Sequence, residues 1–422
     1  MSSNIIDIMS RKTIHTKIFD DLTDEQNYLV NYITREISSG NRQKVSYSGK
    51  AGTGKTTVVK RIIQCLGLEP DEVLAMAYTG KAVMVLAMQN LNCATIHSTI
   101  YNPIICNAKD EDGNLIVKPN GEYKKEFKFV LKEKLASSRL KLLIVDEATM
   151  VNDSLVEEIL SFGLPTIFIG DNNQLPPVFG KSSIMDMPDF TLTKIMRQAE
   201  DSPIITLANK VLNGIPLIIG DYGTSRVIDK LELGENLIRD YDMILCGKNK
   251  TRDLFNDHIR EKVLGIPDKR PVIGDRVVCR ANNWERHVNG FYLVNGMFGY
   301  LTDIDYEHYN GKKLYVDFKP EFLNEEFLRL EMDNKFIQKP YDERKDYGLS
   351  RLCKFEYGYA SSVHLSQGSQ YNNVLFYDEK FGDEEFVKRL RYTAITRAVN
   401  RITILQSKPN YSYYDNTQRL TA

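Results

Sequence analysis

The sequence predicts an α/β protein with two parallel-sheet domains, and three features of the chain lead to this fold class. Two stretches alternate short apolar strands with amphipathic helices, which is typical of a parallel sheet covered by helices. A glycine-rich segment at residues 49–56 stands between a strand and a helix in the first stretch. Short β-prone pieces separated by turn residues interrupt the second stretch between about residues 272 and 351. The second domain is therefore expected to contain an inserted small β-barrel.

The first domain is expected to carry an insertion as well. Its strands are predicted at 45–48, 73–78, 140–146 and 166–170. The segment 101–135 interrupts this pattern and contains two turn signals, Asp-Gly and Pro-Asn-Gly. Its β-prone flanks at 115–117 and 123–129 predict a β-hairpin.

The second domain is expected in two parts on either side of the barrel. A helix is predicted from Ser202-Pro203 to Gly214, because Ser caps helices, Pro suits the first turn and Gly follows helix ends. Its other elements are a strand at 243–246, a helix at 251–264, and strands near 360–364, 374–377 and 402–405. The barrel strands are expected near 276–279, 300–302 and 314–318. The predicted boundaries are 1–100 and 136–185 for the first domain, 101–135 for the hairpin, 186–271 and 352–422 for the second domain, and 272–351 for the barrel.

Composition narrows the class of protein. A hydrophobic content of 42% and a charged content of 26% are those of a soluble globular protein. No apolar run approaches the ~20 residues of a membrane span, and the N-terminus lacks a secretory core, so a cytoplasmic protein is expected. The six cysteines form no C-x-x-C pair, which favours free thiols over disulfides or zinc. With a net charge of −1, a nucleic-acid partner would be held by local positive grooves.

Residues 49–56 match the phosphate-binding pattern G-x-x-x-x-G-K-[ST]. Glycines let backbone N–H groups turn toward a polyphosphate, Lys55 can reach the β- and γ-phosphates, and Thr56 can hold Mg²⁺. The phosphates would lie at the N-terminus of the following helix. The expected nucleotide-binding residues of this segment are Gly49, Ala51, Gly52, Thr53, Gly54, Lys55, Thr56 and Thr57.

Further candidates follow the later strands. Asp146 ends an apolar strand and is placed to bind Mg²⁺, directly or through water, while Glu147 can polarise the attacking water. Gln174 follows the next strand and can reach a γ-phosphate or that water. Arg197 and Arg397 can neutralise transition-state charge, although a surface salt bridge is the simpler interpretation for a single arginine.

Taken together, these motifs resemble those of superfamily 1 helicases of the RecD/Dda-like branch. The matching segments, in order, are 49–56, 77–82, 95–98, 146–150, 170–178, 192–198, 363–369 and 392–398. The segments Gly-Asp-x-x-Gln-Leu-Pro-Pro-Val and His-x-Ser-Gln-Gly-Ser separate this branch from the UvrD/Rep-like branch. The resemblance covers residues from about 22 to 400.

The resemblance implies two RecA-like domains with ATP and Mg²⁺ between them, and an SH3-like barrel in the second. The first domain would supply Lys55, Thr56, Asp146, Glu147 and Gln174. Arg197 and Arg397 would reach the nucleotide from the second domain, with Gly368 nearby. Gln26 would recognise adenine, but Thr23-x-x-Gln26 is also a capping box, and both interpretations stand.

The resemblance also implies a single-stranded DNA track. Its expected residues are Thr79, Lys81, His97, Ser362, His364 and Ser366. Ordinary structural roles are the alternative for each, such as helix caps for the hydroxyl residues. The chain departs from the family at Tyr78, where proline is usual, and at Leu365, where lysine is common.

The hairpin would be the pin that splits the duplex, and its alternative is a solvated amphipathic hairpin. Basic and aromatic residues interleave there, which fits nucleic acid. The expected pin residues are Tyr123, Lys124, Lys125 and Phe127.

The function expected from the resemblance is an ATP-dependent DNA helicase. It would translocate on single-stranded DNA and unwind forked duplex in replication, recombination or repair. Resemblance to this branch implies 5′→3′ movement. The chain would be monomer-competent, with single-strand binding or other replication proteins as candidate partners. The alternatives are a translocase that remodels nucleoprotein without unwinding, a nucleotide-gated DNA-binding module, and an unrelated P-loop ATPase acting on protein.

Overall fold

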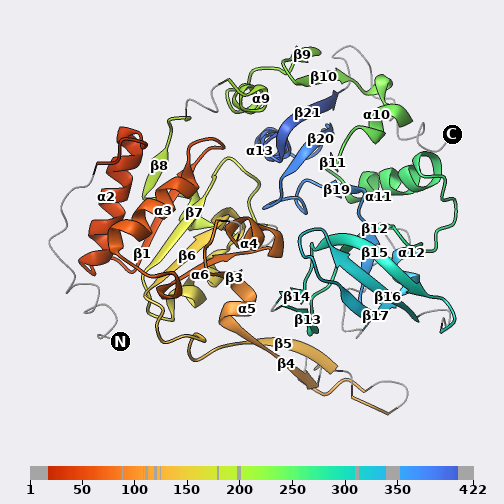
Figure 1. The fold of residues 1–422 in the computed structure, drawn as a ribbon, viewed down its shortest axis with the longest axis horizontal. Coiled ribbons are helices and arrows are strands. Elements are labelled where there is room, and N and C mark those ends of the chain that lie inside the picture. The colour runs from red at the N-terminus through yellow and green to blue at the C-terminus, as the bar shows by residue number, and fades with distance from the viewer. Residues whose placement is uncertain are drawn as a thin grey trace.

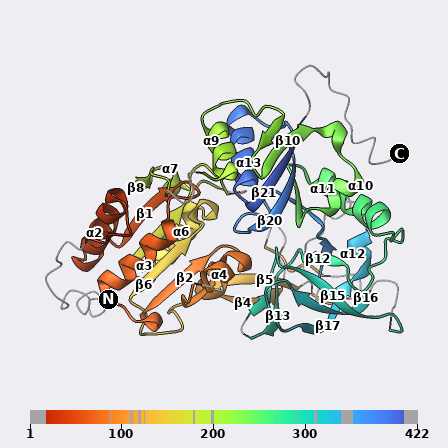
Figure 2. The same ribbon diagram turned by 45° about the horizontal axis from the view of Figure 1, so that its top comes forward.

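The computed structural model has two α/β lobes and a smaller β-domain (Figure 1). It describes residues 18–87, 89–107, 109, 113–117, 121–123, 125–177, 180–196, 201–289, 291–308, 313–338 and 352–406. The N-terminal lobe, the C-terminal lobe and the β-domain surround a central region where all three approach one another (Figure 2).

The N-terminal lobe is built on a parallel six-stranded sheet in the order β3-β2-β6-β7-β1-β8. Its strands are β1 (Lys44–Gly49), β2 (Val73–Ala77), β3 (Cys93–Thr95), β6 (Leu142–Asp146), β7 (Thr166–Gly170) and β8 (Phe190–Leu192). The four predicted strands are confirmed. The sheet continues to β8, so the first lobe extends beyond the boundary expected at residue 185.

Apolar side chains cover both faces of this sheet. Successive side chains of each strand point to opposite faces, and each face is buried in its own hydrophobic core. One face packs against α2 (Asp24–Ser38), α3 (Lys55–Leu66) and α4 (Gly80–Ala87). The other packs against α5 (Ile96–Ile100), α6 (Asp153–Leu160) and α7 (Ser183–Asp186). Short 3₁₀ turns lie at Pro70–Glu72 and Ala148–Met150.

The C-terminal lobe contains a second six-stranded sheet in the order β19-β11-β20-β21-β10-β9. Only β9 is antiparallel to its neighbour among the described pairs. The strands are β9 (Gly220–Tyr222), β10 (Ser225–Asp229), β11 (Met243–Cys246), β19 (Ala360–Ser362), β20 (Tyr371–Tyr377) and β21 (Ala398–Gln406). The sheet shows the α/β architecture predicted from the sequence.

Helices again lie on both faces. The α9 (Pro203–Leu212) and α13 (Glu384–Ile395) helices pack on one face, and α10 (Glu235–Arg239) and α11 (Asn249–His258) on the other. A 3₁₀ turn occupies Lys230–Glu232. The predicted helix at 251–264 begins earlier, at Asn249, and its last part, Ile259–Val263, has π-helical hydrogen bonding.

The first insertion is an antiparallel hairpin, but its arms differ from the predicted ones. The β4 strand (Tyr101–Asn107) pairs with β5 (Lys125–Leu131), while residues 115–117 make only single bridges, Lys109 with Leu115 and Val117 with Tyr123. The first arm contains Pro103, which a two-stranded ladder tolerates because each of its strands has an unpaired edge. The hairpin projects from the N-terminal lobe toward the β-domain (Figure 1).

The second insertion is an antiparallel sheet in the order β17-β16-β15-β12-β18. Its strands are β12 (Arg276–Cys279), β15 (Phe298–Asp305), β16 (Lys313–Pro320), β17 (Phe327–Asp333) and β18 (Phe355–Tyr357). A bridge between Met332 of β17 and Cys353 connects β17 to the segment just before β18, and this β-domain occupies the place of the predicted barrel. A hairpin of β13 (Asn283–Val288) and β14 (Phe291–Leu293) and the helix α12 (Asn334–Gln338) complete the domain. Because β18 pairs with β12, the barrel extends beyond the boundary expected at residue 351.

Buried ion pairs attach the barrel to the C-terminal lobe. The Arg252 guanidinium on α11 lies 2.9 Å from the Glu356 carboxylate of β18. Arg260 makes two 2.9 Å hydrogen bonds to Asp275, just before β12. Removing one partner of such a pair leaves the other charge buried without its counter-charge and lowers the stability of the fold by about 3–5 kcal/mol. These contacts fix the barrel to its lobe.

The six cysteines are free thiols, as predicted. Within the part of the chain that the structure describes, no helix combines the length and apolarity that crossing a membrane requires.

Candidate active site and nucleic-acid track

The phosphate loop connects β1 to α3. Gly54, which precedes α3, has a left-handed backbone with φ of 74°, and Gly49 leaves room for the Thr53 hydroxyl, which would lie 2.5 Å from an added Cβ. The Lys55 ammonium donates to the carbonyls of Gly49, at 2.6 Å, and Lys50, at 3.3 Å. The loop therefore holds its own lysine at the helix N-terminus, where a phosphate group would bind.

Gln26 lies against this loop. Its Oε1 accepts a hydrogen bond from the Thr23 N–H at 2.9 Å, and the Thr23 hydroxyl accepts one from the Gln26 N–H, so the capping box is present. Its Nε2 donates to the Thr53 carbonyl at 2.8 Å. The capping interpretation is confirmed, and the same side chain borders the nucleotide loop, as the adenine interpretation requires.

The two acids at the end of β6 occupy different environments. The Asp146 carboxylate accepts the Glu147 N–H at 2.9 Å, and Glu147 itself has a left-handed backbone, with φ of 51°. Burial, and then the neighbouring Glu147, raise the pKa of Asp146 to about 6. The Asp146 carboxylate and the hydroxyl of Thr56, the second residue of α3, would both offer oxygen ligands, which suit Mg²⁺. The same burial and the same neighbouring carboxylate that raise the pKa of Asp146 would also favour a bound cation, because a cation would balance the negative charge.

Gln174 follows β7 and is buried. Its Oε1 makes no hydrogen bond to any described residue. A buried amide oxygen without a partner is costly, and such groups mark places where a water or ligand belongs. This oxygen can accept a hydrogen bond from a water molecule, as the predicted role requires.

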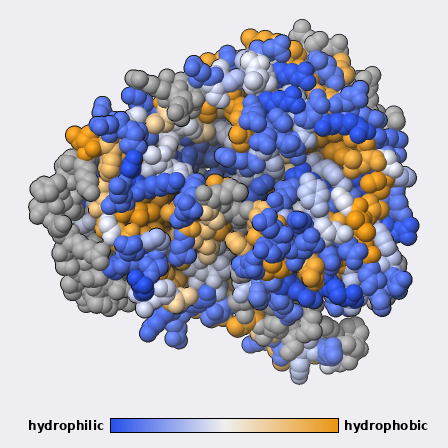
Figure 3. Space-filling model, viewed as in Figure 1, coloured by the Kyte–Doolittle hydropathy of each residue, from blue (hydrophilic) through white to orange (hydrophobic). Residues whose placement is uncertain are grey.

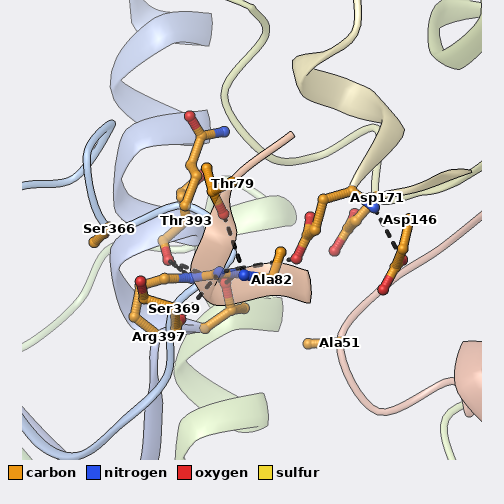
Figure 4. Close-up of polar contacts among 12 residues, drawn as sticks. Ala51, Thr79, Ala82, Asp146, Asp171, Ser366, Ser369, Thr393 and Arg397 are labelled. Atoms are coloured by element: carbon orange, nitrogen blue, oxygen red, sulfur yellow. Dashed lines mark hydrogen bonds and ion pairs between the residues drawn. The ribbon is translucent and has the colours of Figure 1, made fainter. Parts of the chain in front are cut away.

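Arg397 reaches the site from the C-terminal lobe. Its guanidinium donates to the carbonyls of Thr393, at 3.1 Å, and Ser369, at 3.3 Å, and lies 4.0 Å from the Glu147 carboxylate. Figure 4 shows Arg397 between Ser369 and Thr393, with Asp146 and Asp171 across the cleft. Arg197, the other predicted arginine, lies outside the described residues.

Direct hydrogen bonds join the lobes beside this site. The Tyr392 hydroxyl of α13 accepts the Ala51 N–H at 3.0 Å and donates to the Asp171 carboxylate at 2.5 Å. Asp171 and Tyr392 both lie in segments that match the helicase motifs, but the sequence assigned neither side chain a role. Only their approach across the cleft reveals the contact.

A second group of contacts joins the lobes a few residues further on. The Thr393 hydroxyl accepts the Leu175 N–H at 3.0 Å, and the Gln367 amide donates to the Leu175 carbonyl at 2.9 Å. Gly368 packs so closely that an added Cβ would lie 2.9 Å from the Ala82 Cβ. The space-filling view is hollowed where the two lobes face each other (Figure 3).

The predicted DNA-track hydroxyls take structural hydrogen bonds. The Thr79 hydroxyl accepts the Ala82 N–H at 3.2 Å in the first turn of α4, and the Ser362 hydroxyl accepts the Leu365 N–H at 3.3 Å in the turn that follows β19. The Ser366 hydroxyl donates to the Val363 carbonyl at 2.8 Å, and Ser366 is fully buried. Ser366 therefore offers no surface to DNA in this conformation.

Lys81 also has protein partners. Its ammonium lies 4.0 Å from the ring centre of Tyr371 in the C-terminal lobe, and 4.0 Å from the Glu321 carboxylate beside the barrel. It lies 5.7 Å from the ring centre of Phe298. The side chain predicted to hold a DNA phosphate thus joins all three parts of the molecule.

An aromatic cluster surrounds His97 at the base of the hairpin. Its ring lies 5.3 Å from that of Tyr78, 5.6 Å from Tyr101 and 5.9 Å from Phe129, measured between ring centres. Tyr78 and Phe129 remain 39% and 42% exposed. Burial lowers the pKa of His97, so the ring is neutral at pH 7. Near Thr79, these rings present flat surface of the kind on which bases stack.

His364 and the pin residues complete the predicted set. The His364 ring stacks on Phe386 at 5.9 Å, and burial lowers its pKa. Tyr123 is exposed near the hairpin tip. Lys124 and the side chains of Lys125 and Phe127 lie outside the described part of the chain.

Two family models match the chain. The "AAA domain" model matches residues 21–229, and the "UvrD-like helicase C-terminal domain" model matches residues 357–405. The first covers the phosphate loop, Asp146 and Gln174, and the second covers Gly368 and Arg397.

Curated relatives and solved structures point to the same kind of protein as the two family models. The chain is 25% identical to the ATP-dependent DNA helicase dda of Enterobacteria phage T4, over 90% of this chain and 98% of that protein. It is 26% identical to the ATP-dependent RecD2 DNA helicase of Deinococcus radiodurans, over 85% of this chain and 46% of that one. A Pif1 helicase studied at forked double-stranded DNA has the same fold, with a TM-score of 0.52 and 19% identity over 90% of this chain and 92% of its own. Together, the two family models and these relatives indicate a superfamily 1 helicase of the Dda, RecD and Pif1 type.

Proposed function

We propose that the chain is an ATP-dependent DNA helicase that moves along single-stranded DNA and separates duplex at a fork. The convergence of Lys55, Glu147 and Arg397 on one cleft carries this proposal. Relatives named ATP-dependent DNA helicase support it. A non-hydrolysing binding module would need neither a water-activating acid nor an arginine from the opposite lobe.

The residues have separable roles in hydrolysis. Lys55 and the loop N–H groups hold the phosphates, and Thr56 with Asp146 holds the accompanying Mg²⁺, which neutralises phosphate charge when bound. Glu147 accepts a proton from the attacking water, and the Gln174 Oε1 orients that water. Arg397 leaves its carbonyl partners and approaches the γ-phosphate as the lobes close. In this proposal Gln26 borders the adenine and Gly368 permits the close approach of the lobes.

The DNA strand would cross from the N-terminal lobe to the C-terminal lobe. Tyr78, His97 and Phe129 supply stacking surface, with Thr79 next to Tyr78 in the chain. Ser362 lies at the end of β19 in the C-terminal lobe. His364 lies on the C-terminal lobe. The β4–β5 hairpin acts as the pin at the fork, and the barrel, of the SH3-like type, faces it.

Strand displacement with tailed duplexes tests the proposal. We expect ATP-dependent unwinding from a 5′ single-stranded tail, and none from a 3′ tail, consistent with 5′→3′ movement. Lys55→Ala should abolish hydrolysis and unwinding, whereas Lys60→Ala, an exposed position on the same helix, should retain both. Unwinding from the 3′ tail alone would overturn the direction. Hydrolysis without strand separation would select a translocase that remodels nucleoprotein.

The pin role has its own test. Shortening the hairpin by replacing residues 110–125 with a tight turn should reduce unwinding while leaving DNA-stimulated hydrolysis. Unchanged rates of both would show that the hairpin is only a solvated surface element.

A further inference from the structure

We propose that Tyr392 is a latch that competes with the nucleotide for the phosphate loop. It is a positioning residue for the reaction, and the proposal rests on the proposed function of this cleft. The hydroxyl belongs to the C-terminal lobe, but both of its hydrogen-bond partners belong to the N-terminal lobe.

The geometry of the latch is a relay of two hydrogen bonds. The Ala51 N–H donates to the Tyr392 oxygen at 3.0 Å, and the Tyr392 hydroxyl donates to Asp171 at 2.5 Å. Tyr392 is 1% exposed. Burial and the adjacent Asp171 carboxylate raise its pKa, so the phenol keeps the proton that it donates. The Asp171 carboxylate is further held by the N–H of Asn173 at 3.1 Å.

Tyr392 and a bound phosphate would compete because the Ala51 backbone has only one hydrogen to donate. Ala51 has a single N–H, and backbone N–H groups of such loops are the donors that cradle phosphate. That N–H cannot fully donate both to Tyr392 and to a phosphate oxygen. A phosphate that takes this proton therefore releases one of the bonds that join the lobes.

The release is transmitted to the catalytic arginine. Tyr392 and Thr393 lie on the last turns of α13, and the Arg397 guanidinium is held by the Thr393 carbonyl at 3.1 Å. When the Tyr392 hydroxyl leaves Ala51, the end of α13 loses one of its bonds to the N-terminal lobe, so it shifts more easily as the lobes close, and Arg397 moves with it. After product release, the latch takes the loop N–H again.

Nucleotide binding by the full chain tests the latch. Calorimetric titration with a non-hydrolysable ATP analogue and Mg²⁺ should show Tyr392→Phe binding about fivefold more tightly than the natural chain, because one competing hydrogen bond is removed. Tyr357→Phe is the matched control, since its buried hydroxyl donates to the Lys269 carbonyl far from the loop. We expect this control to bind within twofold of the natural chain. In hydrolysis assays, Tyr392→Phe should lower both KM and kcat.

The results that would overturn the latch differ from those that would overturn the proposed helicase function. Unchanged or weaker binding by Tyr392→Phe, with melting like that of the control, would overturn the latch. If Tyr392→Phe does not fold, Asp171→Asn weakens the acceptor of the same hydroxyl and should tighten binding by a smaller factor; unchanged or weaker binding would again overturn the latch. A natural chain without DNA-stimulated hydrolysis would refute the proposed function, while the binding comparison would still decide the latch.

Discussion

Replacing Lys81 with methionine distinguishes a contact between lobes from a contact with DNA. Methionine keeps the apolar stem and removes the ammonium. In the structure that ammonium lies 4.0 Å from the Tyr371 ring centre and 4.0 Å from the Glu321 carboxylate. Since these partners belong to different parts of the molecule, the substitution loosens the arrangement of the lobes and barrel without emptying either core.

The magnitude follows from these two contacts. A partly desolvated cation–π contact contributes about 1–2 kcal/mol. The ion pair is long, and its side chains are 19% and 23% exposed, so it adds about 0.5 kcal/mol at most. Together the two contacts contribute about 1–2.5 kcal/mol, so Lys81→Met should shift the balance toward more open arrangements by roughly 5- to 60-fold, at 1.4 kcal/mol per tenfold. We expect DNA-stimulated hydrolysis to fall by a similar factor when DNA and ATP are saturating.

Salt dependence of single-stranded DNA binding is the decisive assay. A lysine that neutralises one phosphate contributes about 0.7 to the slope of log affinity against log salt. Because the Lys81 ammonium has protein partners, we expect Lys81→Met to leave this slope unchanged, as should the control Lys60→Met. A slope reduced by about 0.7, with saturated hydrolysis at the natural rate, would refute this reasoning and restore the DNA contact.

Three further predictions concern the cleft and the aromatic cluster. Gly368→Ala adds a Cβ 2.9 Å from the Ala82 Cβ at a φ of +72°, so the DNA-stimulated kcat should fall at least tenfold with little change in melting temperature; a normal kcat would contradict this. Burial lowers the pKa of His97 below its unfolded value, so its contribution to stability is complete above about pH 6.5 and is lost as the pH falls. Urea midpoints between pH 5 and 7 should therefore vary less in His97→Phe, and an equal variation would count against it. Phe129→Ala should weaken single-stranded DNA binding about fivefold or more in fluorescence anisotropy without changing the salt slope, and unchanged affinity would exclude stacking there.

Much of the fold could be predicted because its signals are local. The strands at 73–77, 142–146 and 166–170 are apolar runs ended by polar residues, and such runs report burial directly. The pattern at residues 49–56 has a fixed spacing because a loop of this kind has to wrap around one phosphate chain. Boundaries between domains were less accurate, since β8 and β18 join sheets through pairing with distant strands.

The hairpin and Gln26 show where local signals are insufficient. Residues 115–117 are as β-prone as the true first arm, and only the partner strand decides which segment pairs. Gln26 matches both a capping box and an adenine contact, because an amide can serve either role. The structure shows the cap, together with a hydrogen bond to the loop that sequence spacing does not contain.

The sequence by itself determined the two α/β lobes, the glycine-rich loop pattern and the two acids at the end of β6, because each depends on residues close together in the chain. Only the tertiary structure decided that Tyr392 bonds to Ala51, 341 residues away, and that Lys81 contacts Tyr371 and Glu321. These contacts join separately folded parts of the molecule. Their partners are set by how the lobes and barrel pack, and no local pattern of residues encodes that arrangement.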